Sequence, residues 1–195
     1  MSKPKKSGPA IFMYTVIAIT VILAIICFTV YYACNYKSNI VLWTGIVSFT
    51  IMYHFWVRII MGNVSKLFVK HINYNQWWFK ERKFEKKLYK KLKVKEWKDK
   101  ALTYNPETFS LKNHSLEEIA NTMAKSEVDH WINELISLST ILFSIPWGAF
   151  WIFLSTAIFA MIFDSQFIII QRFNRPRIVK LLEREKRDKI KEDEA

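Results

Sequence analysis

Long runs of residues without a formal charge constrain this chain more than any other feature of its sequence. The first run is Ile11–Tyr32, the second is Ile40–Trp56, and the third, Leu135–Ile170, contains a single charged residue, Asp164. A helix that crosses a bilayer needs about 20 consecutive apolar residues. A soluble domain of 195 residues would not normally carry runs of this length, so the sequence predicts an integral membrane protein.

The basic segments between the runs predict how the chain crosses the membrane. Lys and Arg are concentrated in Gly62–Lys125 and in the tail from Arg172 onward, and such residues mark the cytoplasmic flanks of membrane spans. If both segments are cytoplasmic, the apolar run between them crosses twice, and Pro146–Gly148 provides the outer turn. We therefore expect an all-α integral membrane protein with about four transmembrane helices in the cell membrane and both termini in the cytoplasm.

The same pattern divides the chain into four expected parts. Residues 1–62 form an N-terminal transmembrane hairpin, and residues 63–125 form a basic cytosolic or interfacial segment between the second and third helices. Residues 126–177 form a second transmembrane hairpin, and residues 178–195 form a charged cytosolic tail. We interpret the first apolar run as an anchor rather than a cleaved signal peptide, because it is longer than a typical signal core and lacks a clean small-residue cleavage site.

The basic segment contains an apolar stripe at helical spacing. Phe84, Leu88 and Leu92 are four residues apart and are surrounded by Lys, which predicts an amphipathic helix that lies on an anionic membrane surface. The alternative is a solvated basic helix packed against the rest of the protein. The net charge of +12 is segregated from the apolar runs, whereas a nucleic-acid-binding module would show a basic face on a soluble fold.

The sequence contains no pattern typical of a metal or nucleotide site. Cys27 and Cys34, the two cysteines, are seven residues apart in or beside the first apolar run, a separation of about 10 Å along a helix that excludes a disulfide between them. There is no Cys/His cluster with metal-binding spacing, no Walker loop and no G-x-G-x-x-G. We therefore expect no metal and no resident cofactor.

A histidine and a carboxylate lie together where a polar helix enters the third apolar run. Ser115 and Glu118 have the spacing of a capping box, so a helix is expected to begin at Ser115. Glu127 and His130 are three residues apart on this helix, which makes their side chains neighbours. Ionisable groups at such a position are costly and therefore indicate function.

Three polar residues are expected at one depth in the membrane. Counted from the outer helix ends at 1.5 Å per residue, His54, His130 and Asp164 all lie about 21–23 Å inward, near the cytoplasmic edge of the hydrocarbon. One interpretation is a cluster delivered by three helices. The other is that each side chain belongs to an unrelated helix end and reaches out to the interface. For His54 taken alone, helix packing is the favoured role.

Two short motifs carry a resemblance to a known family. They are Glu127–Trp131, which reads E-x-x-H-W, and Gln171–Arg177, which reads Q-R-F-N-R-P-R. Together they resemble the glycosyl-4,4'-diaponeurosporenoate acyltransferases, bacterial enzymes that add the fatty acyl group in staphyloxanthin-type carotenoid synthesis. The resemblance covers roughly Trp78–Leu182, and the run Ile11–Tyr32 is an addition to the family pattern.

The resemblance implies transfer of a fatty acyl group from an acyl-CoA-type donor to a sugar hydroxyl of a membrane lipid. The acceptor would be a glycosylated carotenoid or a related glycolipid, and acyl-CoA would be a co-substrate rather than a bound cofactor. A sugar hydroxyl needs a positioned base, so His130 is the expected general base, and Glu127 would orient its imidazole. The residues expected to bind substrate or stabilise the tetrahedral intermediate are His54, Asp164, Arg172, Asn174, Arg175 and Arg177.

Two other classes of function are compatible with the same residues. A non-enzymatic membrane adaptor would use the basic segment to bind anionic lipid or a partner protein. A small transporter would use His54, His130 and Asp164 as a proton relay, although four helices without a visible repeat are a poor basis for alternating access.

Overall fold

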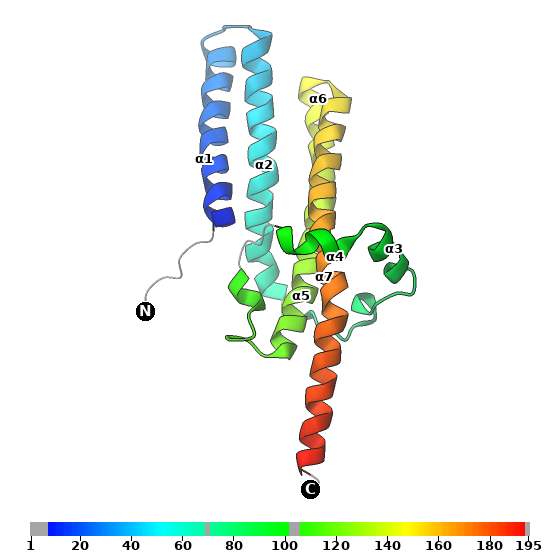
Figure 1. Cartoon of the computed structure of the whole chain (residues 1–195). Coiled ribbons are helices and arrows are strands. Elements are labelled where there is room, and N and C mark those ends of the chain that lie inside the picture. The colour runs from blue at the N-terminus through cyan, green and yellow to red at the C-terminus, as the bar shows by residue number, and fades with distance from the viewer. Residues whose placement is uncertain (1–7, 69–70, 102–105, 194–195) are drawn as a thin grey trace, which may run out of the picture.

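The computed structural model describes residues 8–68, 71–101 and 106–193, and within these ranges every regular element is a helix. Figure 1 shows two long hairpins side by side, with their turns at the same end of the molecule and the C-terminal half of the last helix extending beyond both. The predicted all-α fold class is therefore confirmed. Among the described residues, three helices are long and apolar enough to cross a membrane.

The first hairpin consists of α1 (Gly8–Phe28), extended by a π-helical turn at Thr29–Ala33, and α2 (Asn39–Phe68). The two helices pack closely because small residues lie between them. A Cβ atom added at Gly45 of α2 would lie 3.0 Å from the Cβ of Cys27 and 3.1 Å from the ring of Phe28. Gly45 thus sets the distance between α1 and α2.

The second hairpin has one interrupted arm and one continuous arm. Its first arm consists of α5 (Leu116–Leu138), a 3₁₀ segment at Ser139–Phe143 and α6 (Ser144–Trp147). Gly148 and Ala149 then turn the chain with positive φ angles of 70° and 52°, and α7 (Phe150–Asp193) returns along α5. The turn lies at the predicted position, and a crossing by the interrupted arm would bring the number of spans to the expected four.

The segment between the hairpins is built from short helices: η3 (Trp77–Phe79), α3 (Glu85–Lys91), α4 (Val94–Trp97), η4 (Lys98–Lys100) and η5 (Pro106–Phe109). The predicted amphipathic helix is only seven residues long, because the chain turns at Lys93 with a left-handed φ of 51°. Phe84, Leu88 and Leu92 remain 60%, 37% and 41% exposed, so the expected apolar face does point outward.

A small core joins this segment to the extended part of α7. It consists of Tyr74, Phe79, Ala120, Ala124 and Leu182, all of which are buried. The predicted capping box at the start of α5 is present: the Ser115 hydroxyl accepts from the Glu118 amide, and the Glu118 carboxylate accepts from the Ser115 amide. The hydrogen bond from the Ser115 backbone lowers the pKa of Glu118.

The helices do not break at the boundaries expected between the four parts. α2 runs through residue 62, α5 runs through residue 125, and α7 continues past residue 177 with Pro176 inside it. Since α7 has 44 residues, it is about 66 Å long and extends well beyond one bilayer. The apolar parts of α2, α5 and α7 are thus each continuous with a more polar helical segment.

Replacing Gly45 with Leu should destabilise the first hairpin, because the side chain would overlap Cys27 and Phe28. We expect a loss of about 1–3 kcal/mol in the free energy of unfolding in detergent. The matched control is Gly62→Leu on the same helix, where an added Cβ meets nothing within 4 Å. Equal loss of stability in both variants would contradict the close packing of α1 on α2.

Candidate active site

A buried carboxylate on α7 joins three helices. Asp164 is 0% exposed. Its Oδ1 lies 2.8 Å from Nδ1 of His130 on α5, and its Oδ2 forms an ion pair with Arg58 on α2. A carboxylate removed from water is stable only when it is paired and hydrogen-bonded, and these two contacts provide that pairing. His130 and Asp164 are therefore in direct contact, as the cluster interpretation predicts, and do not belong to unrelated helix ends.

The ring of His130 is held in a fixed orientation. It stacks on Phe167 with 4.8 Å between ring centroids and 11° between ring planes. Its Nδ1 faces Asp164, so the opposite nitrogen, Nε2, points away from the carboxylate. An ionised carboxylate only accepts hydrogen bonds. Asp164 therefore favours the neutral tautomer in which Nδ1 carries the proton and Nε2 carries the free lone pair.

Arg58 is held by the helices on both sides of it. Its guanidinium donates to the backbone oxygen of His54 at 2.5 Å and to that of Ala160 on α7 at 3.3 Å, in addition to its ion pair with Asp164. Both ring nitrogens of His54 are buried and have no hydrogen-bond partner among the described residues. Arg58 therefore ties α2 to α7, whereas His54 presents an unused polar group beside it.

A second buried network lies on the same two helices, α5 and α7. Glu127 is 0% exposed and forms ion pairs with Arg172 at 2.6 Å and Arg175 at 2.7 Å. Arg172 also donates to the carboxylate of Glu85 at 2.5 Å. Tyr89 donates to the same carboxylate at 2.9 Å, and burial raises the pKa of Tyr89. Two arginines and two glutamates thus fix α3 against the hairpin.

The structure corrects the expected partner of His130. Glu127 was expected to orient the imidazole, but Asp164 makes that contact and Glu127 binds Arg172 and Arg175 instead. The physical reason is that α7 presents two permanent cations to Glu127, which bind a carboxylate more strongly than a neutral imidazole does. Asp129, which was not expected to contact His130, pairs with Lys125 at 2.6 Å.

The expected substrate-binding arginines have different surroundings from one another. Arg175 is 2% exposed, donates to the backbone oxygen of Phe79 at 2.9 Å and lies over its ring, so its guanidinium is buried and mostly engaged by the protein, although Nη1 has no hydrogen-bond partner within the described residues. Arg172 is similarly committed to two carboxylates. Arg177 is exposed and lies over the ring of Phe173, and Asn174 is half-buried beside it on α7. Arg177 therefore suits an external anion better than Arg172 or Arg175.

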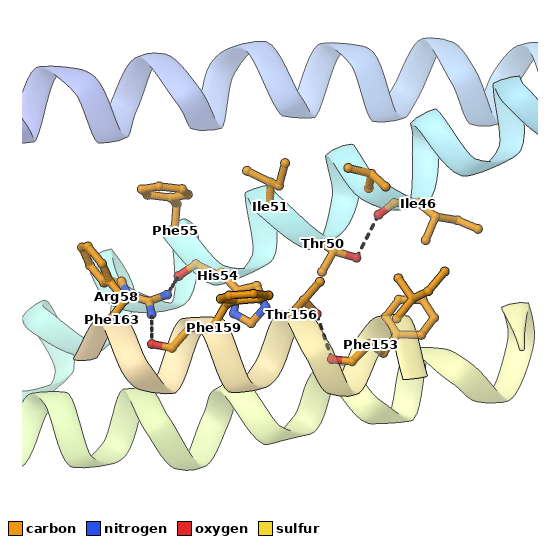
Figure 2. A pocket seen from close by; sticks show the side chains of 13 residues that line it. Ile46, Thr50, Ile51, His54, Phe55, Arg58, Phe153, Thr156, Phe159 and Phe163 are labelled. Atoms are coloured by element: carbon orange, nitrogen blue, oxygen red, sulfur yellow. Dashed lines mark hydrogen bonds between the residues drawn. The ribbon is translucent and has the colours of Figure 1, made fainter. Parts of the chain in front are cut away.

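Two apolar clefts flank the polar layer. The first, of about 330 Å³, lies between α2 and α7 (Figure 2). His54 and Arg58 lie at one end of it, and Ile46 and Phe153 lie at the other. The second cleft, of about 450 Å³, lies between α3 and the α5–α7 pair and includes Trp78, Leu88, Trp131 and Ile168. An apolar cleft thus lies on each side of the α5–α7 pair.

Three polar residues at or beside these networks were not predicted as site residues: Arg58, Glu85 and Glu134. Arg58 could have been found from the sequence. It is the single charged residue between the second apolar run and the apolar residues that follow it, and it lies one helical turn after His54. Glu134 follows His130 by the same interval and accepts from Ser165 at 2.5 Å. Glu85 gave no signal, because its contact with Arg172 depends on how the segment between the hairpins folds.

A family model matches more than half of the chain. The family is glycosyl-4,4'-diaponeurosporenoate acyltransferase, and the match covers residues 75–184. The matched region contains His130, Asp164 and the Glu127 network, whereas Arg58 and His54 lie outside it. Among curated proteins and solved structures, none matches the chain. The match agrees with the resemblance seen in the two sequence motifs.

Replacing Glu127 with Ala should destabilise the protein strongly, because it leaves Arg172 and Arg175 without their shared counter-ion. We expect a loss of about 3–5 kcal/mol in the free energy of unfolding in detergent. The matched control is Glu117→Ala on the same helix, which removes an exposed pair with Lys186 and should change stability little. A Glu127→Ala variant as stable as the control would show that the network is not structural.

Proposed function

Because the chain belongs to the glycosyl-4,4'-diaponeurosporenoate acyltransferase family, we propose that it moves a fatty acyl group from an acyl-CoA-type donor to a hydroxyl of a glycosylated lipid, with His130 as the general base. The family supports acyltransferase activity on a glycolipid. The donor, the hydroxyl and the role of each residue are our proposal. We place the reaction at the cytoplasmic edge of the cell membrane, with both chain termini in the cytoplasm.

The observation that carries the proposal is the contact between His130 and Asp164. A hydroxyl is a weak nucleophile near neutral pH and needs a base within hydrogen-bond reach. A histidine whose Nδ1 binds a buried carboxylate can take a proton on Nε2, and the carboxylate stabilises the imidazolium that results. Arg58 pairs with the other oxygen of Asp164 and thereby compensates the charge of this buried carboxylate.

The proposed reaction proceeds in two proton transfers. Nε2 of His130 takes the proton of the acceptor hydroxyl while the hydroxyl oxygen bonds to the carbonyl carbon of the donor thioester. The tetrahedral intermediate then collapses, the carbon–sulfur bond breaks, and the imidazolium returns the proton to the departing thiolate. Atoms and charge balance without a metal or a redox partner, and the products are an ester and a free thiol.

The exposed basic groups suit the hydrophilic part of such a donor. Lys86, Lys87 and Lys90 are exposed on α3, and Arg177 is exposed on α7. The phosphates of a coenzyme A moiety would bind cations of this kind. This assignment replaces Arg172 and Arg175, whose guanidinium groups are occupied by Glu127 and Glu85.

A membrane adaptor is the second proposal, and one observation favours it. Phe84, Leu88 and Leu92 form an exposed apolar face beside the lysines of α3, which is the composition of a segment that binds anionic membranes. An adaptor has no use for a hydrogen-bonded base, so the two proposals differ in whether His130 matters.

Replacing His130 with Ala should lower acyl transfer by about 10²–10⁴-fold, the range expected for loss of a general base. The assay measures transfer from radiolabelled palmitoyl-CoA to the glycolipid fraction in membranes that contain equal amounts of wild type and variant. His114→Ala is the matched control, because His114 lies at the solvent-exposed start of the same helix beside Glu118. This control should keep full activity.

A charge-reversal variant separates the enzyme from the adaptor. Replacing Lys86, Lys87, Lys90 and Lys91 with Glu should raise the KM for acyl-CoA but leave catalysis measurable if the protein is an enzyme. If the glycolipid is labelled as strongly with His130→Ala as with the wild type, His130 takes no part in the reaction. Loss of membrane or partner binding in the charge-reversal variant, with no transfer by any variant, would favour the adaptor.

A further inference from the structure

We infer that the cleft between α2 and α7 binds the fatty acyl chain of the donor, with the acyl carbonyl at Arg58 and His54. This inference rests on the proposed acyl transfer and names the part of the substrate that the cleft holds. It also assigns a role to the N-terminal hairpin, which lies outside the region that matches the family. The occupant is a single alkyl chain that ends in a hydrogen-bond acceptor.

The walls of the cleft are apolar along its length. Ile46, Val47, Ile51 and Phe55 contribute from α2, and Phe153 and Phe159 contribute from α7. The two threonines in the lining have their hydroxyls bonded to their own helix backbones: Thr50 to Ile46 at 2.9 Å and Thr156 to Phe153 at 2.8 Å. The cleft therefore offers a hydrocarbon surface with no free hydroxyl.

One end of the cleft is polar, and some of its nitrogen atoms form no hydrogen bond with the described residues. The ring nitrogens of His54 and the Nε atom of Arg58 are buried and have no hydrogen-bond partner within the described residues. Figure 2 shows the His54 ring pointing from α2 toward α7 beside Phe159. Buried donors without partners are costly. An acyl carbonyl in this position would accept from Nε of Arg58 and from whichever ring nitrogen of His54 carries the proton, and it would lie beside the Arg58–Asp164 pair.

The other end is closed by aromatic rings. Phe153 is fully buried and packs on Phe143 and Trp147 at 6.0 Å and 6.4 Å between ring centroids. Trp147 also contacts Phe49 of α2 at 5.9 Å. These contacts bridge the two hairpins above the cleft, so they limit how far a chain can extend from the polar end.

The length between the two ends suits a fatty acyl chain. Ile46 and Arg58 are twelve residues apart on α2, which corresponds to about 18 Å along a helix. The hydrocarbon core of a bilayer is about 30 Å thick and contains two layers of acyl chains, so one chain spans about half of that. The cleft is therefore long enough for one chain of the kind that membranes contain.

One side of the cleft faces outward, which provides an entry route. Val47, Ile51 and Phe159 line it and are 48%, 38% and 73% exposed. In a membrane these side chains would contact lipid, so an acyl chain already dissolved in the bilayer would enter sideways. The coenzyme A part would stay at the membrane surface beside the polar end of the cleft.

Filling the cleft should change the preferred length of the acyl donor. Thr156 lies between the polar and closed ends, so Thr156→Phe should block the inner half. We expect the ratio of palmitoyl-CoA to decanoyl-CoA transfer to fall by about tenfold or more, as is typical when a pocket excludes part of an alkyl group. Ser155→Phe is the matched control, because Ser155 is the exposed neighbour on α7 and should leave the ratio unchanged.

An unchanged ratio in an active Thr156→Phe variant would overturn the inference, as would an equal change in the control. Binding is measured separately by photocrosslinking in the His130→Ala variant, with a palmitoyl-CoA analogue that carries a diazirine at its terminal carbon. Labelling should concentrate on peptides that contain Ile46 or Phe153. Labelling of the lipid-facing residues of α1 to the same extent would mean that the probe reports bulk lipid, and the inference would fail.

The two experiments separate this inference from the proposed function. Absence of acyl transfer by the wild type, together with specific labelling of the cleft, would contradict the enzyme but support an acyl-binding cleft. Acyl transfer that depends on His130, together with nonspecific labelling and an unaltered chain-length preference, would support the enzyme and overturn the cleft.

Discussion

The structure depends on a carboxylate that is buried where the chain is most apolar. Asp164 lies within a helix long and apolar enough to span a membrane and is fully buried, a position that costs several kcal/mol unless the charge is compensated. Its two oxygens are compensated by groups from two other helices, Arg58 on α2 and His130 on α5. The two hairpins must therefore stay in register, and this requirement places a histidine, an arginine and the end of an apolar cleft in one layer.

A second buried charge network lies about one helical turn from His130 on α5 and two to three turns from Asp164 on α7. The two networks differ in their contacts. Glu127, Arg172, Arg175 and Glu85 pair with one another and hold α3 and η3 against the hairpin. In the Asp164 layer, the ring nitrogens of His54 and one nitrogen of Arg58 have no hydrogen-bond partner in the part of the chain that is described, and Nη1 of Arg175 in the Glu127 network has none either. The Asp164 layer differs in that it also holds a histidine, His130. We therefore propose a structural role for the Glu127 network and a chemical role for the Asp164 layer, which includes His130.

Features that depend on helical period and on charge could be predicted from the sequence. Features that depend on which helix faces pack against each other could not. The capping box at Ser115 and the turn at Gly148 follow from local residue types and were predicted. The common depth of His130 and Asp164 followed from the rise per residue. The choice between Glu127 and Asp164 as the partner of His130 depends on the rotation of α7 against α5, which spacing on α5 alone does not contain. Likewise, the break of the first arm at Ser139 and the inward position of Glu85 depend on tertiary packing.

The central claim is that Asp164 acts on the reaction through His130, and Asp164→Asn tests it most directly. Asn keeps the shape of the side chain and still accepts from Arg58, but it removes the charge that fixes the tautomer of His130 and stabilises the imidazolium. The rate of labelled acyl transfer should fall by about 10²–10⁴-fold. Because Arg58 loses its counter-ion, the unfolding transition should shift downward, so the rate is measured on detergent-solubilised protein that keeps the elution volume of the wild type. Asp129→Asn, which alters a carboxylate paired with Lys125 on α5, should keep the wild-type rate. A folded Asp164→Asn variant with the wild-type rate would contradict the account.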